Sequence, residues 1–84
     1  MNDSELKEGI LRALARVAPE AEGVVVDPNE PFRNQFEIDS MDFLNFILGL
    51  EKDYGIKVPE TSYPRFGNLS GAIASLGPLV AAKA

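Results

Sequence analysis

The side chain with the clearest chemical use is the hydroxyl of Ser40, which lies in the run Ile38-Asp39-Ser40-Met41-Asp42. Asp39 is a favoured helix N-cap residue and an apolar run follows Asp42, so Ser40 is expected in the first turn of a helix. Free backbone N–H groups and the helix dipole favour a phosphate at such a position. Helix capping alone is the plainer interpretation of the same residues, and the two roles are compatible.

The chain lacks the residues that usually activate such a hydroxyl. Its 84 residues include no histidine and no cysteine, so the commonest general base near neutral pH and any thiolate nucleophile are missing. An enzyme is therefore not expected. Ser40 is instead predicted to be a substrate, which another protein either phosphorylates or loads with a phosphate-linked group.

A metal site is not predicted either. Glu37, Asp39 and Asp42 could gather a divalent cation only loosely, because the run lacks the central glycine and terminal glutamate of a calcium loop. The absence of cysteine also excludes a zinc site of the Cys type.

The negative charge of the chain is concentrated in one region. Thirteen acidic and eight basic side chains give a net charge of -5, and residues 18–42 alone hold seven acids and one base, Arg33. No cluster of bases could neutralise phosphates, so nucleic acid is not expected as a partner. The imbalance of charge therefore lies almost wholly in the stretch that ends around Ser40.

The apolar residues are too dispersed for a membrane span. The longest apolar run, residues 46–50, is far shorter than the roughly 20 residues that cross a bilayer. The first residues are acidic and polar, the reverse of a signal peptide. With 45% hydrophobic residues, the chain is expected to form one globular domain over residues 1–84. We also expect it to be cytoplasmic and monomeric, without membrane insertion.

Two long helices are predicted on either side of the first loop. Leu6, Ile10 and Leu14 recur at helical spacing in a helix over residues 3–18. A second helix, over residues 39–54, has so many apolar residues that some of them must stay exposed. Gly49 lies inside this second helix at a cost of about 1 kcal/mol relative to alanine, which indicates that another backbone approaches closely there.

A long first loop is predicted over residues 19–38. This stretch contains three prolines and shows no helical period. Its expected anchors in the core are Val24, Val26, Phe32 and Phe36.

The end of the chain is predicted to form two further helices. A short one covers residues 60–66 and a last one covers residues 68–77, where Gly77-Pro78 ends or kinks it. The predicted fold is thus all-α: a small antiparallel four-helix bundle with three main helices, one short helix and a long first loop.

Three pieces of the sequence together resemble an acyl carrier protein. They are the Asp-Ser pair of Ile38-Asp39-Ser40-Met41-Asp42, the helix after it as far as Glu51, and the exit Tyr54-Gly-Ile-Lys-Val-Pro59. The resemblance covers most of the chain. It implies that a separate phosphopantetheinyl transferase attaches 4′-phosphopantetheine from coenzyme A to Ser40 through a phosphodiester. The thiol of that arm would carry acyl groups as thioesters and would supply the thiol that a cysteine-free chain lacks.

The resemblance also implies which residues partner enzymes touch. Asp39 matches the acid that helps the transferase engage the serine, and the helix after it is offered to basic patches on acyl-transferring and acyl-processing enzymes. The partner-recognition residues are Asp39, Met41, Asp42, Leu48 and Glu51, with Asp53 as a further acid on the same helix. By pattern alone, Met41 and Leu48 are also candidates for the core, and each acid is also an ordinary surface charge.

Some positions depart from the family's pattern. Glu37 replaces a common glycine, Asn45 replaces a common acid, and Lys52 interrupts the acidic run of the helix. These departures favour a specialised carrier over the housekeeping carrier of fatty-acid synthesis, within fatty-acid, lipid or polyketide-type biosynthesis. Two alternatives stay open: a peptidyl or aminoacyl carrier, and an unmodified helical module for protein interaction.

Overall fold

The computed structural model describes residues 1–83, and this part of the chain is helical without strands. Three helices of 15 residues form the body of the molecule: α1 (Asp3–Val17), α3 (Ser40–Tyr54) and α4 (Leu69–Lys83). The shorter elements are η1 (Pro19–Ala21), α2 (Phe32–Gln35) and η2 (Glu60–Gly67). The predicted all-α bundle with three main helices and a shorter fourth one is confirmed.

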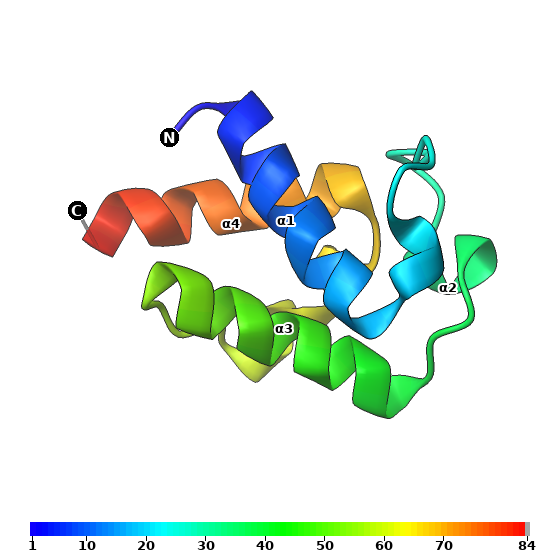
Figure 1. Cartoon of the computed structure of the whole chain (residues 1–84). Coiled ribbons are helices and arrows are strands. Elements are labelled where there is room, and N and C mark those ends of the chain that lie inside the picture. Colours follow the sequence, from blue (N-terminus) through cyan, green and yellow to red (C-terminus); the bar gives the residue numbers. More distant parts are fainter. Residues whose placement is uncertain (84) are drawn as a thin grey trace.

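Helix α1 lies at the centre of the arrangement. It packs against both α3 and α4, and η2 packs against α4. In Figure 1, α3 and α4 run from the right-hand end of the molecule to the left, and α1 crosses them in the opposite sense. The start of α3 and the long loop with α2 therefore lie at one end of the bundle, and both chain ends lie at the other.

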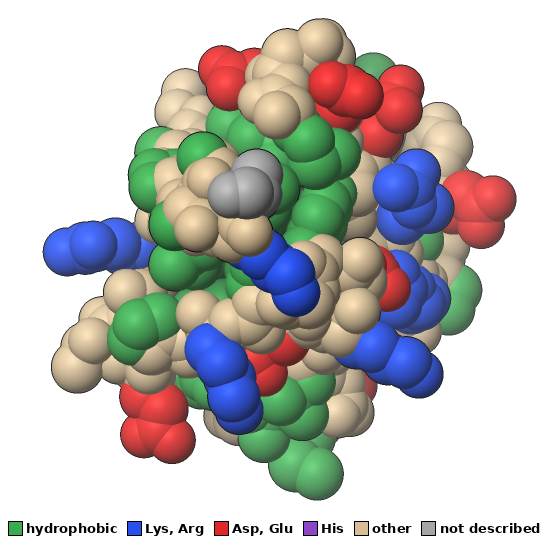
Figure 2. Space-filling view, turned by 90° about the vertical axis from the view of Figure 1, so that its left-hand side faces the viewer, with side chains coloured by type: hydrophobic (Ala, Val, Ile, Leu, Met, Phe, Trp, Pro, Cys, Tyr) green, Lys and Arg blue, Asp and Glu red, His purple; other side chains and the backbone are tan. Residues whose placement is uncertain are grey.

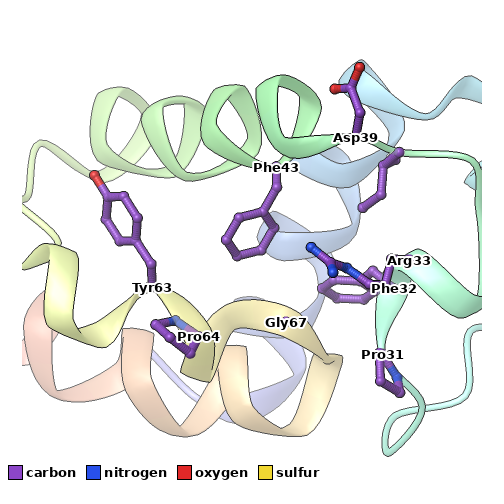
Figure 3. Close-up of a pocket in the computed structure, with 9 residues that line it drawn as sticks. Pro31, Phe32, Arg33, Asp39, Phe43, Tyr63, Pro64 and Gly67 are labelled. Atoms are coloured by element: carbon purple, nitrogen blue, oxygen red, sulfur yellow. The ribbon is translucent and has the colours of Figure 1, made fainter.

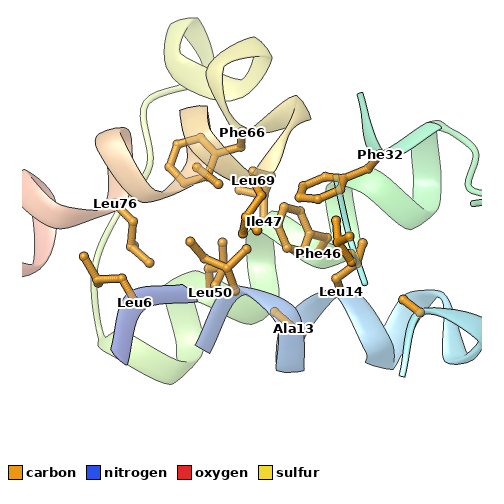
Figure 4. Packing of buried hydrophobic residues seen from close by; sticks show 14 of the residues in the cluster. Leu6, Ala13, Leu14, Phe32, Phe46, Ile47, Leu50, Phe66, Leu69 and Leu76 are labelled. Carbon is orange, nitrogen blue, oxygen red and sulfur yellow. The ribbon is translucent and has the colours of Figure 1, made fainter. Parts of the chain in front are cut away.

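The core is built from one apolar stripe of each long helix. Leu6, Ile10 and Leu14 of α1 are buried as their spacing predicts. They meet side chains of α3, α4 and η2, and Figure 4 shows the rings of Phe32 and Phe66 closing the cluster from the loop and from η2. Each fully buried side chain of this size contributes about 1.5–3 kcal/mol.

The first loop is more structured than the sequence indicates. It contains η1 and the short helix α2, which correct the prediction of a loop throughout residues 19–38. Val26 and Phe32 are buried anchors and Phe36 is half-buried, whereas Val24 is 50% exposed and the prediction that it anchors the loop is wrong. The loop gains further support where the backbone N–H of Ser70 donates to the carbonyl of Pro28, with N and O 2.9 Å apart.

The last helix passes through Gly77-Pro78 and continues to Lys83, which corrects the predicted end at residue 77. Proline removes one backbone hydrogen bond, the one to the carbonyl of Ala74, and Ala74 is exposed to solvent. Leu79 and Val80 pack against the core, and Lys83 Nζ donates to the Gly55 carbonyl at 2.7 Å. These tertiary contacts hold the final turns in place despite the proline.

The remaining differences are local. Helix α1 ends at Val17, one residue before its predicted end. The predicted single turn over residues 60–66 is the eight-residue 3₁₀ helix η2, which extends to Gly67 and buries Phe66 completely.

The close backbone approach predicted at Gly49 is wrong, and the glycine with a close neighbour in another helix is Gly9, where that neighbour is a side chain. A Cβ at Gly49 would meet only Arg16 Nη1 at 3.5 Å, which is an ordinary contact. A Cβ at Gly9 would overlap the hydroxyl of Tyr54, the residue at the end of α3. That hydroxyl is buried and has no hydrogen-bond partner among the described residues. Helices α1 and α3 thus need a glycine at position 9.

The two glycines predict opposite effects of alanine on stability. Gly9→Ala is expected to lower the free energy of unfolding by up to about 2 kcal/mol, because the cost of about 1–3 kcal/mol for displacing Tyr54 exceeds the gain of about 1 kcal/mol in helix propensity. Gly49→Ala is expected to raise it by about 0.5–1 kcal/mol through helix propensity. Urea unfolding followed by circular dichroism measures both, and a Gly9→Ala variant as stable as the parent would contradict the contact between Gly9 and Tyr54.

Candidate functional site

Ser40 is the first residue of α3, at the end of the bundle that also holds α2. The residue is exposed, and its hydroxyl takes part in none of the side-chain hydrogen bonds among the described residues. Its backbone lies in the first helical turn, where N–H groups lack partners within the helix. The structure therefore places the Ser40 hydroxyl where the sequence predicts it, exposed at the N-terminus of a helix.

Asp39 and Asp42 hold the backbone on either side of Ser40. The N–H of Asp42 donates to Asp39 Oδ1 at 2.8 Å, and the N–H of Asp39 donates to Asp42 Oδ2 at 3.1 Å. This reciprocal pair is a capping box with aspartate in place of the usual glutamate or glutamine. Asp39 is exposed and Asp42 is half-buried, so both carboxylates also bring negative charge to the surface around Ser40.

Two apolar side chains of α3 point to solvent. Met41 is 65% exposed and Leu48 is 45% exposed, so the interpretation of either as a core residue is wrong. They lie seven residues apart, which places them two turns from each other on one face of the helix. Leu44, one turn from each, is half-buried. We call Met41, Leu44 and Leu48 the α3 apolar stripe.

The acids farther along α3 are engaged within the fold. Glu51 is half-buried, and its Oε2 accepts the backbone N–H of Val58 at 2.7 Å. Asp53 forms an ion pair with Arg16 of α1. Glu51 thus fixes the extended link after α3, and Asp53 joins α3 to α1, besides any contact that either makes with a partner.

A pocket of about 360 Å³ lies beside the start of α3. Its walls come from three separate elements: Phe32 and Arg33 of α2, Ile38, Asp39 and Phe43 around the start of α3, and Tyr63 of η2. Figure 3 shows the ring of Phe43 reaching from α3 into this space. Sequence reasoning missed Arg33 and Tyr63, because only the fold brings residues 33 and 63 together. The signal for Arg33 was that it is the one base among residues 18–42.

The face that carries both chain ends has charges of both signs (Figure 2). On this face Lys and Arg side chains are scattered, one of them near the middle and several beside acidic ones (Figure 2). A nucleic-acid site needs a continuous basic patch or stripe. Among residues 1–83, no group of three potential ligands could hold a metal ion, and no helix is long and apolar enough to cross a membrane.

Comparison with known proteins finds a family match over the part of the chain that contains Ser40. Residues 8–73 match the family model for the phosphopantetheine attachment site. The acyl carrier protein of Myxococcus xanthus is 27% identical over 70 residues, which cover 80% of this chain and 89% of that protein. The acyl carrier protein of Micrococcus luteus is also 27% identical, over 80% of this chain and 86% of its own length.

The capping box predicts different effects of two substitutions at Asp39. Asp39→Ala is expected to lower the free energy of unfolding by about 1 kcal/mol, because the N–H of Asp42 loses its acceptor. Asp39→Asn keeps a side-chain oxygen at the cap and should stay within about 0.5 kcal/mol of the parent. Urea unfolding measures the difference, and equal losses would mean that the charge of Asp39, rather than its capping bond, stabilises α3.

Proposed function

The chain belongs to the phosphopantetheine attachment-site family, that of the acyl carrier proteins, and from this membership we propose that it carries acyl groups on an arm attached to Ser40. The observation that carries the proposal is an exposed serine with a free hydroxyl at the N-terminus of a helix within the matched region. The chain acts as a carrier and the chemistry belongs to its partner enzymes.

The residues around Ser40 fit a phosphopantetheine group. The serine hydroxyl is free to be esterified, and the N-terminal end of α3 places N–H groups and the positive end of the helix dipole beside the phosphodiester. The group supplies a thiol that forms thioesters with acyl groups, a function that no side chain of this cysteine-free chain provides.

The same end of the molecule offers a place for the acyl group between deliveries. The pocket beside Ser40 has aromatic and aliphatic walls, formed in part by Phe32, Ile38 and Phe43. An acyl chain within it would be removed from water, which favours burial by about 0.8 kcal/mol for each CH₂. Because Asp39 lines the pocket and Ser40 is the next residue, the arm would start at the edge of this pocket.

Partner enzymes are proposed to bind the α3 apolar stripe and the acids beside it. Met41 and Leu48 supply exposed apolar area, and Asp39 and Asp42 supply negative charge within one turn of Met41. Apolar side chains at the centre of such an interface carry most of its binding energy, whereas charges at its edge mainly raise the association rate. Basic patches on the transferase and on acyl-processing enzymes are the complementary surface.

Attachment at Ser40 is tested by intact mass. The parent chain, incubated with coenzyme A and a phosphopantetheinyl transferase, is expected to gain the mass of one phosphopantetheine group, and Ser40→Ala is expected to gain none. The matched control is Ser70→Ala, since Ser70 is an exposed serine in the first turn of α4. No added mass on the parent, or added mass on Ser40→Ala, would refute the proposal and favour an unmodified interaction module.

The docking surface is tested by the rate of the same modification. Met41→Ala and Leu48→Ala are each expected to lower kcat/KM of the transferase by about fivefold, which corresponds to about 1 kcal/mol of lost contact. Unfolding free energies should change little because both side chains are exposed. Val25→Ala, at a position 98% exposed in the loop, is the control. Rates that match this control would exclude the α3 apolar stripe from the transferase interface.

A further inference from the structure

The pocket beside Ser40 contains one charged side chain that the carrier function leaves without a role, Arg33. Its guanidinium is directed from α2 into the space bounded by the rings of Phe32 and Phe43 (Figure 3). Apart from Arg33 and Asp39, the residues that line the pocket are uncharged. A permanent cation therefore faces a largely apolar cavity.

Arg33 is exposed, and no acid among residues 1–83 forms an ion pair with it. Glu20 and Glu37 line a separate surface groove with Arg33, and Glu20 Oε2 accepts the backbone N–H of Glu37 at 3.3 Å.

The carboxylate of Asp39 accepts the N–H of Asp42 and, in Figure 3, points away from the guanidinium of Arg33. Glu30, three residues before Arg33, accepts the side-chain amide of Asn34 at 2.8 Å. The five N–H donors of Arg33 remain available to a group that enters the pocket.

The part of the arm beyond the phosphodiester has only neutral amide, hydroxyl and thioester groups, so an anion inside the pocket would have to be part of the cargo. Ser40 does not line the pocket, whereas Asp39 before it does. A phosphodiester on the Ser40 hydroxyl would thus begin outside the pocket, and only the part of the arm beyond the phosphodiester could enter. The planar guanidinium fork matches a carboxylate, which it can bind through two parallel hydrogen bonds.

We propose that Arg33 makes this carrier selective for acyl groups that bear a carboxylate of their own, that is, monothioesters of dicarboxylic acids. The inference rests on the proposed attachment at Ser40. Methylene groups of such a cargo contact Phe43 and Ile38, and its carboxylate binds the Arg33 guanidinium. A carboxylate that entered an apolar pocket without such a partner would lose its hydration uncompensated. An acyl chain without a carboxylate gains nothing from the cation.

The test compares two six-carbon cargoes that differ only in the terminal carboxylate. Adipoyl-pantetheine and hexanoyl-pantetheine arms are loaded from their coenzyme A thioesters onto the parent, Arg33→Gln, Arg33→Lys and the control Arg12→Gln, on α1. The mass of each product is recorded first. The readout is the rate of thioester cleavage by hydroxylamine, which is slower when the cargo is held in the pocket.

Cleavage of the adipoyl arm is expected to be up to about fivefold faster on Arg33→Gln than on the parent, the upper range for one exposed ion pair. Arg33→Lys should recover part of the protection, and Arg12→Gln should match the parent. The hexanoyl arm should be cleaved at one rate on all four proteins. Equal acceleration of both cargoes would overturn the proposal, because Arg33 would then bind the arm itself; unchanged rates would also overturn it.

The same experiment distinguishes a wrong site of attachment from a wrong assignment of cargo selectivity to Arg33. If no mass is added to Ser40, the carrier function and the selectivity fall together. If mass is added and the two cargoes behave alike on the parent and on Arg33→Gln, only the selectivity falls.

Discussion

The edge-on packing of Phe32 against Phe46 is the contact on which the site depends. The two ring centroids lie 5.6 Å apart at an interplanar angle of 76°, and both side chains are almost completely buried. Such a pair contributes about 0.5–1.5 kcal/mol beyond the burial of its area. Because Phe46 belongs to α3 and Phe32 to the long loop, the contact fixes the loop against the helix that begins at Ser40. The pocket lies between the loop and the start of α3, since Phe32 and the residues on either side of it form one wall.

The acids of this chain serve the fold as well as the surface. The carboxylates of Asp39 and Asp42 cap α3, and that of Glu51 holds the link at Val58. A hydrogen-bonded carboxylate keeps its charge, so capping and attraction of a basic partner can coexist. The two roles affect different quantities. A capping bond contributes about 1 kcal/mol to the free energy of unfolding, whereas a surface charge mainly raises the rate of association with a partner.

Sequence reasoning predicted the features that local patterns determine. The stripe of α1, the capping of α3 and the end of α3 at Tyr54 depend on residues within one or two turns of each other. The features that it missed depend on contacts between distant segments: α4 continues through Pro78 because Leu79 and Val80 pack against the core and Lys83 donates to the Gly55 carbonyl. The pocket was missed for the same reason, since its walls come from residues about thirty positions apart, and a side chain such as Phe43 has the same apolar signature in a wall as in a core.

The order of Asp39 and Ser40 has a physical reason in this structure. Serine is itself among the best N-cap residues, and a capping serine uses its hydroxyl oxygen to accept a backbone N–H. Here Asp39 occupies the cap, so the helix is closed by a carboxylate and the next residue begins the first turn with its hydroxyl free. The aspartate thereby leaves Ser40 exposed at the positive end of α3, where an incoming phosphate is stabilised and the side chain is available for attachment.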